Sequence, residues 1–178
     1  MSAGAVLCGG RSRRMGTDKA LVEVDGVAMA ERVARALEAA GCAPVAFVGG
    51  DAAGLGRFGR PFYPDRWPGE GPLGGVRTAL VDVGGDVVVA ACDLPFLDAS
   101  TIGSLLAAAA PGVDVAMATT ERIQPAVAWW SASARAPIED AWRDGVRALH
   151  EAVARLRMVA VPVDPGALRN INAPADLG

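Results

Sequence analysis

The sequence predicts an α/β protein with a three-layer α/β/α arrangement, in which a mostly parallel β-sheet is covered by helices on both faces. Continuously apolar segments such as Ala3–Leu7, Val45–Val48 and Val87–Ala91 are typical of strands buried on both sides. A segment with helical spacing, Ala28–Ala40, lies between the first two. Strands that alternate with helices in this way favour a parallel sheet.

Length, composition and charge narrow the class further. The chain has 178 residues, of which 52% are hydrophobic and 21% charged, which predicts one globular domain over residues 1–178. A net charge of −3 argues against nucleic acid or an anionic membrane as a partner. No segment has the length of a membrane span or the pattern of a secretory leader. Three cysteines without metal-ligand spacing are typical of free thiols, so we expect a cytoplasmic protein.

The first half of the chain reads as strand, turn, helix and strand. After the first strand, Asp25-Gly26 marks a turn, and the helix Ala28–Ala40 ends before Gly41. Pro61–Pro64 is expected to be a short third strand, whereas glycines leave Ala52–Arg60 without an assignment.

The second half begins with a long proline- and glycine-rich loop, Pro64–Leu73, of a kind that often carries function. Gly74-Gly75 is expected to open a helix over Val76–Val81, followed by a turn over Asp82–Asp86. The remaining expected elements are the strand Val87–Ala91, the helix Ala99–Ala110 capped by Asp98, the strand Val113–Ala118, an added strand Ala126–Trp130, a mostly helical segment Ser131–Leu156 and a last strand Met158–Val163.

A glycine-rich turn follows the first strand, and we take it as the main candidate site. Gly9-Gly10 brings bare backbone N–H groups close to a ligand, and Arg11, Arg14 and Lys19 follow with positive charge. This arrangement suits a polyanion such as a triphosphate, although the spacing fits neither common phosphate-loop motif. The alternative is a polar surface turn with solvated cations.

Two aspartates lie at predicted strand ends on the same edge of the sheet. Asp93 follows the most apolar strand, and a carboxylate that faces a triphosphate needs a hard cation between them, which predicts Mg²⁺. Asp65 has the same potential role. Capping of a local turn is the alternative for both residues.

The missing residue types restrict the chemistry. His150 is the only histidine, which argues against a histidine-dependent triad or a histidine-rich zinc site. Phosphoryl or nucleotidyl transfer remains, because it needs positioning and charge rather than a covalent nucleophile.

The ordered motifs of the chain resemble the molybdenum cofactor guanylyltransferase (MobA-like) branch of the nucleotidyltransferases. The opening segment Leu7-Cys8-Gly9-Gly10-x-x-x-Arg14-Met15-Gly16-x-Asp18-Lys19 is similar to the family's first motif, with Cys8 in place of an alanine. The later motifs follow in the family's order: Asp65, Gly71-Pro72-Leu73-Gly74-Gly75, Cys92-Asp93-Leu94-Pro95-Phe96, Gln124-Pro125 with Ala128, and Asn170-Ile171-Asn172-Ala173-Pro174.

The resemblance implies a Rossmann-like nucleotidyltransferase fold and the transfer of GMP from GTP to the terminal phosphate of molybdopterin or Mo-molybdopterin. It implies catalytic roles for Lys19, Asp93 and Arg14, with Asp93 holding Mg²⁺. The implied nucleotide-binding residues are Leu7, Cys8, Gly9, Gly10, Lys19, Asp65 and Asp93, and those on the pterin side are Arg147, Asn170 and Asn172. Molybdenum enzymes or cofactor-insertion proteins are the implied protein partners.

Other functions remain open on the sequence. Val48-Gly49-Gly50 stands where the resemblance implies an asparagine that helps to read guanine, so a cytidylyltransferase acting on the same pterin is an alternative. A nucleotidyltransferase for another phosphorylated small molecule is a second alternative. A non-catalytic nucleotide- or pterin-binding protein is a third, which Lys19 and Asp93 argue against.

Overall fold

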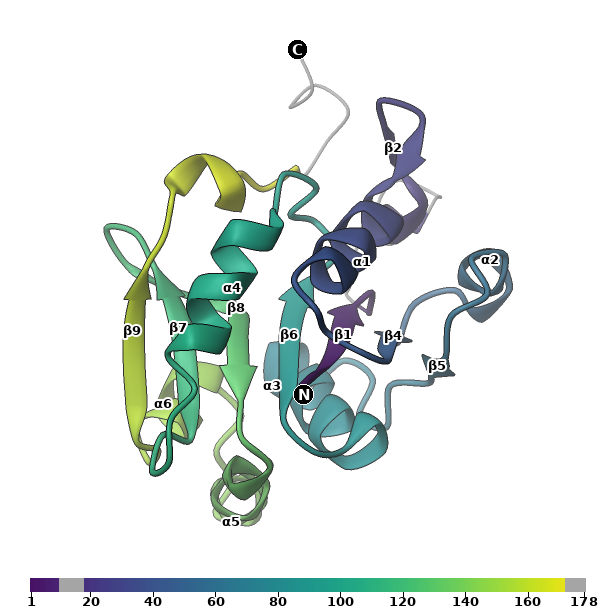
Figure 1. Cartoon of the computed structure of the whole chain (residues 1–178). Helices are drawn as coiled ribbons and strands as arrows, with labels where there is room; N and C mark the ends of the chain where they lie inside the picture. The colour runs from purple at the N-terminus through teal and green to yellow at the C-terminus, as the bar shows by residue number, and fades with distance from the viewer. Residues whose placement is uncertain (10–17, 172–178) are drawn as a thin grey trace.

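The computed structural model of the chain describes residues 1–9 and 18–171. A seven-stranded sheet of order β5-β4-β1-β6-β8-β7-β9 lies between helices on its two faces (Figure 1). Its strands are β1 (Ala3–Leu7), β4 (Val45–Val48), β5 (Phe62–Tyr63), β6 (Val87–Ala91), β7 (Val115–Thr119), β8 (Ile123–Trp130) and β9 (Met158–Pro162). All neighbouring pairs are parallel except those of β8 with β6 and β7, which confirms the predicted mostly parallel α/β/α fold.

The helices form two layers. Helices α1 (Met29–Ala39) and α4 (Ala99–Ala107) cover one face, and α3 (Gly71–Thr78), α5 (Arg135–Arg143) and α6 (Leu149–Val153) cover the other (Figure 1). The shorter elements are η2 (Lys19–Leu21), the hairpin β2 (Glu23–Val24) and β3 (Val27–Ala28), α2 (Ala52–Gly56), the π-helical turn η3 (Ala79–Val83), η4 (Ala132–Ala134) and η5 (Pro165–Leu168). None of the helices in the described parts of the chain has the length and apolar character needed to cross a membrane.

Helix α1 packs closely onto the centre of the sheet because its apolar stripe meets a glycine there. Val33 and Leu37 are fully buried against the sheet. A Cβ at Gly4 in β1 would lie 3.3 Å from Leu37 and 3.0 Å from Val45, so the missing side chain allows the helix to approach. Helix α1 lies within the predicted range Ala28–Ala40. The predicted turn at Asp25-Gly26 is also present, with both residues at positive φ in the β2–β3 hairpin.

The predicted bounds of the loop Pro64–Leu73 and of the helix after it are wrong, as the position of α3 shows. Helix α3 begins at Gly71, so the helix expected over Val76–Val81 starts five residues earlier and the loop from Pro64 is shorter. Pro72 fits the first helical turn, where its missing N–H has no partner to lose. The turn expected over Asp82–Asp86 is also wrong at its start, because η3 continues the helix to Val83 before Gly84 ends it at positive φ.

The second half of the sheet contains two further differences. Strand β8 begins at Ile123, three residues before the predicted start, and lies between β6 and β7. The segment expected to be mostly helical over 131–156 is divided into η4, α5 and α6, since Gly145 adopts a positive φ after α5. The unassigned segment after β4 contains α2, whose first N–H groups are capped by Asp51.

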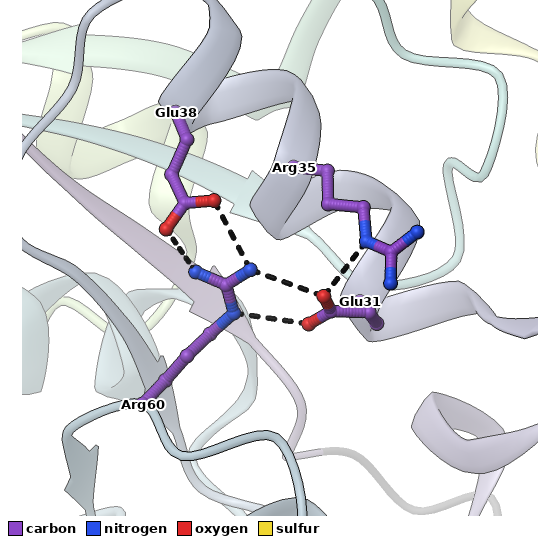
Figure 2. Close-up of polar contacts among 4 residues, drawn as sticks. All are labelled: Glu31, Arg35, Glu38 and Arg60. Carbon is purple, nitrogen blue, oxygen red and sulfur yellow. Dashed lines mark hydrogen bonds and ion pairs between the residues drawn. The ribbon is translucent and has the colours of Figure 1, made fainter.

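An ion-pair cluster fastens the segment after α2 to helix α1 (Figure 2). Arg60 donates hydrogen bonds to both Glu31 and Glu38, and Arg35 donates to Glu31 from the same helix. The cluster fixes the segment that leads into β5, and so helps to place the loop that contains Asp65.

Candidate active site

The carboxyl ends of β1, β4, β5 and β6 meet at one edge of the sheet because these four strands run in parallel. Each end leads into a residue or turn that the sequence singled out. They are Leu7-Cys8-Gly9 after β1, Gly49-Gly50 after β4, Asp65 after β5 and Asp93 after β6. The structure therefore brings the described part of the predicted nucleotide site together at one edge.

Lys19 and Asp93 lie in direct contact at this edge. Lys19 Nζ, in η2, donates a hydrogen bond of 2.8 Å to Asp93 Oδ2, and both side chains are about four-fifths buried, with exposed fractions of 19% and 23%. A cation that contacts phosphate and a carboxylate that holds a metal ion are needed side by side in nucleotidyl transfer. The Lys19–Asp93 pair is therefore the part of the site that most directly supports this chemistry.

Asp18 joins the segment before η2 to the end of β4, a role that the sequence analysis missed. Its Oδ1 accepts a hydrogen bond from Ala20 N at 3.0 Å, and its Oδ2 accepts one from Asp51 N at 2.7 Å. Asp18 thereby holds Lys19 in place beside the strand ends. Its position directly before a short helix was the available signal, since aspartate favours such caps.

Asp65 lies against the glycines of the other strand ends. Its Oδ2 would be 3.6 Å from a Cβ built on Gly9, and its Cβ would be 3.4 Å from one built on Gly49. Gly49 has a φ of +70°, and a Cβ there would lie 3.1 Å from the backbone of Gly9. Only glycine fits this close approach, so the floor between Gly9 and Asp65 consists of bare backbone.

Cys8 and Cys92 continue the β1–β6 register, and their side chains are neighbours. Both thiols are free and buried. Burial raises the pKa of the Cys8 thiol well above its ordinary value, and the neighbouring Cys92 raises it further. A neutral thiol is a poor nucleophile, which agrees with the expected chemistry of positioning and charge.

The loop after Asp93 is held by α1 and by the end of the described chain. Arg32 in α1 donates from Nε to the carbonyl oxygen of Pro95 at 2.9 Å. Ile171 N donates to the carbonyl oxygen of Asp93 at 3.0 Å, so the exposed Asn170 lies next to this loop. Arg32 was missed by the sequence analysis because its target is a backbone carbonyl 63 positions away.

Arg147, predicted for the pterin side, lies between α5 and α6 and contacts the residue that precedes α3. It forms an ion pair of 3.4 Å with Glu70 and stacks 3.8 Å from the Trp142 ring. Its side chain therefore lies next to the helix whose first turn reaches the site edge. The remaining predicted site residues, Gly10, Arg14 and Asn172, lie outside the described residues.

The residues present fit a single Mg²⁺ ion that shares its ligands with a substrate. Within residues 1–9 and 18–171, no group of three or more acidic, cysteine or histidine side chains is arranged to hold a metal. Asp93 supplies a carboxylate at the end of β6, and its Oδ1 has no protein hydrogen-bond donor among those residues. Mg²⁺ in nucleotide sites is commonly held by one or two carboxylates together with phosphate oxygens.

A cavity in the described part of the chain lies away from this edge. A groove of about 320 Å³, lined by Asp86, Trp129 and Ser131 among others, is located at the amino end of β6. We assign the site to the carboxyl edge because Lys19, Asp93 and Gly9 lie there, whereas none of the residues that line the groove is basic.

Comparisons with known proteins identify the family of the chain. Residues 4–160 match the MobA-like NTP transferase domain. A probable molybdenum cofactor guanylyltransferase from Opitutus terrae is 33% identical over 98% of this chain and 92% of the relative. A molybdenum cofactor guanylyltransferase from Rhodobacter capsulatus is 38% identical over 98% of this chain and 92% of the relative.

A solved structure shares the fold over nearly the whole chain. The molybdopterin-guanine dinucleotide biosynthesis protein A from Archaeoglobus fulgidus has a TM-score of 0.78 and 28% identity, and the match covers 98% of this chain and 94% of that one. The fold, the order of the motifs and these similarities lead to one conclusion: the chain belongs to the MobA-like NTP transferase family.

Proposed function

We propose that the protein transfers GMP from GTP to the terminal phosphate of molybdopterin or Mo-molybdopterin. The observation that carries the proposal is the Lys19–Asp93 pair at 2.8 Å, at the edge of the sheet where Gly9 follows β1. Relatives of the chain are named as guanylyltransferases. An oxygen of the acceptor phosphate attacks the α-phosphorus of GTP. The bond from that phosphorus to the bridging oxygen breaks, and pyrophosphate leaves.

The side chains of the site divide this work by charge. Lys19 donates hydrogen bonds to phosphate oxygens and stabilises the negative charge that develops in the transition state. Asp93 holds Mg²⁺, which neutralises phosphate charge and aligns the triphosphate when it is bound. Asp65 accepts a hydrogen bond from the nucleoside, and Arg14 adds positive charge on the phosphate side. Arg147, Asn170 and Asn172 contact the pterin.

The proposal extends to the location of the protein and to its protein partners. Free thiols at Cys8, Cys42 and Cys92 support a reducing compartment such as the cytoplasm. The product would pass to molybdenum enzymes or to the proteins that insert the cofactor.

The first test is pyrophosphate release with each of the four nucleoside triphosphates, in the presence of Mg²⁺ and molybdopterin. We expect release with GTP, and its loss in Asp93→Ala. Asp140→Ala, which removes an exposed carboxylate of α5 that pairs with Arg143 in the same segment, serves as the matched control. Release that persists in Asp93→Ala would contradict the metal role.

A second candidate is cytidylyl transfer to the same pterin. It is favoured by Gly49 and Gly50, which offer no side chain for reading guanine. Release with CTP and not with GTP would decide for it, and would leave the roles of Lys19 and Asp93 unchanged.

A further inference from the structure

Thr78, a buried residue in the last turn of α3, makes polar contacts with the loop that carries Asp65. Its Oγ1 lies 3.2 Å from Asp65 Oδ1 and 3.0 Å from the carbonyl oxygen of Gly74, and it accepts a hydrogen bond of 3.2 Å from Arg66 N. The residue has no exposed surface. One hydroxyl group therefore contacts the carboxylate of Asp65 and the backbone of the next residue.

The hydroxyl has a single proton for two acceptors. An ionised carboxylate is a stronger acceptor than a helix carbonyl, so the hydrogen bond to Asp65 Oδ1 is favoured when Asp65 is charged. Trp67 N donates a second hydrogen bond to the same oxygen at 3.0 Å. Oδ1 is thus satisfied by the protein.

The other carboxylate oxygen has a different environment. Among the described residues, no protein group donates a hydrogen bond to Asp65 Oδ2. This oxygen lies on the side of Gly9, at 3.6 Å from the place where a Cβ would be. The two donors on Oδ1 therefore orient the carboxylate with its second oxygen toward the glycine floor.

The loop is also held from the α5 side, which makes this orientation rigid. The Arg77 guanidinium lies 3.6 Å from the centre of the Trp67 ring and 3.9 Å from that of Trp142. It forms two hydrogen bonds with Glu139, at 2.9 and 2.7 Å. Consecutive residues of α3, Arg77 and Thr78, thus hold Trp67 and Asp65.

We propose that Thr78 is a positioning residue of the nucleotide site, whose hydroxyl orients Asp65 so that Oδ2 receives a donor group of the bound nucleoside. The donor is an N–H of the base or a hydroxyl of the ribose. The inference rests on the proposed function and adds to it a residue that touches no substrate. Thr78 acts on the bound nucleoside through the Asp65 carboxylate, and its contact with Arg66 N holds the backbone of the same loop.

The test compares GTP binding, measured by titration calorimetry with Mg²⁺, in Thr78→Val and Thr78→Ser. Valine keeps the shape and removes the hydroxyl, and we expect it to weaken GTP binding about tenfold, as the loss of an orienting hydrogen bond to a charged group does. Serine keeps the hydroxyl and should bind within about twofold of the unmodified protein. Thr101→Val in α4, also a buried helical threonine but on the opposite face, is the matched control and should bind normally.

A double-mutant cycle separates positioning from a general structural role. In Asp65→Ala, the further change Thr78→Val should leave GTP affinity unchanged, because Thr78 acts on the bound nucleoside through that carboxylate. An additional loss in the double variant would overturn the proposal. The same holds if Thr78→Val binds GTP as tightly as Thr78→Ser.

Failure of the inference differs from failure of the proposed function. If the unmodified protein binds GTP and loses it in Asp65→Ala but not in Thr78→Val, only the role of Thr78 is wrong. If the unmodified protein does not bind GTP, the proposed nucleotide is wrong. Should Thr78→Val lower the melting temperature, its binding is compared with Thr78→Ser at a temperature where both are folded.

Discussion

Lys19 and Asp93 are 74 positions apart in the chain and 2.8 Å apart in space. The contact keeps a flexible lysine side chain in one place, which reduces the entropy that is lost when it binds phosphate.

Lys19→Met should therefore reduce the turnover rate more than the stability. We expect kcat to fall by about 10²- to 10³-fold, the usual effect of removing one charge-stabilising donor. Steady-state pyrophosphate release measures it, and thermal melting shows whether the protein is folded. A fall in melting temperature without a fall in kcat would assign Lys19 a structural role.

Gly50 shows how closely the backbone approaches its neighbours at the site edge. It has a φ of +86°, and a Cβ there would lie 2.9 Å from Cys8 Cβ. Gly26 has a similar φ of +74°, but nothing lies within 4 Å of its added Cβ.

Gly50→Ala should destabilise the protein by about 3 kcal/mol or more, whereas Gly26→Ala should cost roughly 1 kcal/mol for the backbone conformation alone. Urea unfolding of both variants gives the difference. Equal losses would mean that the close approach to Cys8 adds no cost.

Secondary-structure elements are joined by buried charged groups at two places away from the site. At the first, Arg60 connects the segment before β5 with α1 (Figure 2). Burial acts to raise the pKa of Glu31, but hydrogen bonds from Arg60 and Arg35 outweigh it and hold the pKa below its ordinary value.

Arg60→Met should lower the free energy of unfolding by roughly 1–3 kcal/mol, because it leaves the buried Glu31 with fewer donors. Arg35→Met removes a solvent-exposed partner of the same carboxylate and should cost less than about 1 kcal/mol. Denaturant unfolding at neutral pH provides both values. If Arg35→Met lowers the free energy of unfolding as much as Arg60→Met, burial of the Arg60–Glu31 contact does not explain the loss.

The second connection joins β7 to the segment before β9. Asp114 accepts hydrogen bonds from Arg157 Nε at 2.9 Å and Nη2 at 2.8 Å, and from Ser133 Oγ at 3.1 Å. The hydrogen bonds from Arg157 hold the pKa of Asp114 well below its ordinary range, against the effect of burial.

Asp114 should therefore stabilise the fold at neutral pH and lose this effect in acid. Because its pKa is lower in the folded chain, its contribution is complete above the unfolded pKa of about 3.9 and declines as the pH falls below that value. Asp114→Asn should have a lower melting temperature at pH 7, and the gap should narrow below about pH 4. A constant gap across this range would exclude the ionised pair as the cause.

The folded chain carries its site residues along the carboxyl edge of the sheet. They lie in loops that connect well-packed helices and strands. Ligands that bind only the folded chain stabilise it by mass action, by about 2.7 kcal/mol at a hundredfold excess over Kd. GTP with Mg²⁺ should therefore raise the melting temperature.

In Asp93→Asn, the part of this shift that depends on Mg²⁺ should disappear, because the amide is a weaker ligand for a hard cation. Differential scanning fluorimetry with and without a chelator measures it. Unchanged Mg²⁺ dependence would place the metal on other groups.

Local sequence patterns were sufficient for the central parallel strands and for the residues that follow them. Apolar runs identified β1, β4 and β6, and the parallel order implied that Gly9, Gly49 and Asp93 share an edge. Glycine at positions of close approach and aspartate at strand ends are also visible in the chain, because their conformational preferences are local.

Contacts between residues that are far apart in the sequence became clear only from the tertiary structure. The insertion of β8 between β6 and β7, the pairing of Lys19 with Asp93 and the contact of Thr78 with Asp65 depend on how whole elements pack. Thr78 is an ordinary helical residue in the sequence, and nothing in its neighbours indicates the carboxylate it meets. The reason is physical: periodicity and turn propensity act over a few residues, whereas the core that brings α3 against the Asp65 loop is formed by side chains from many segments.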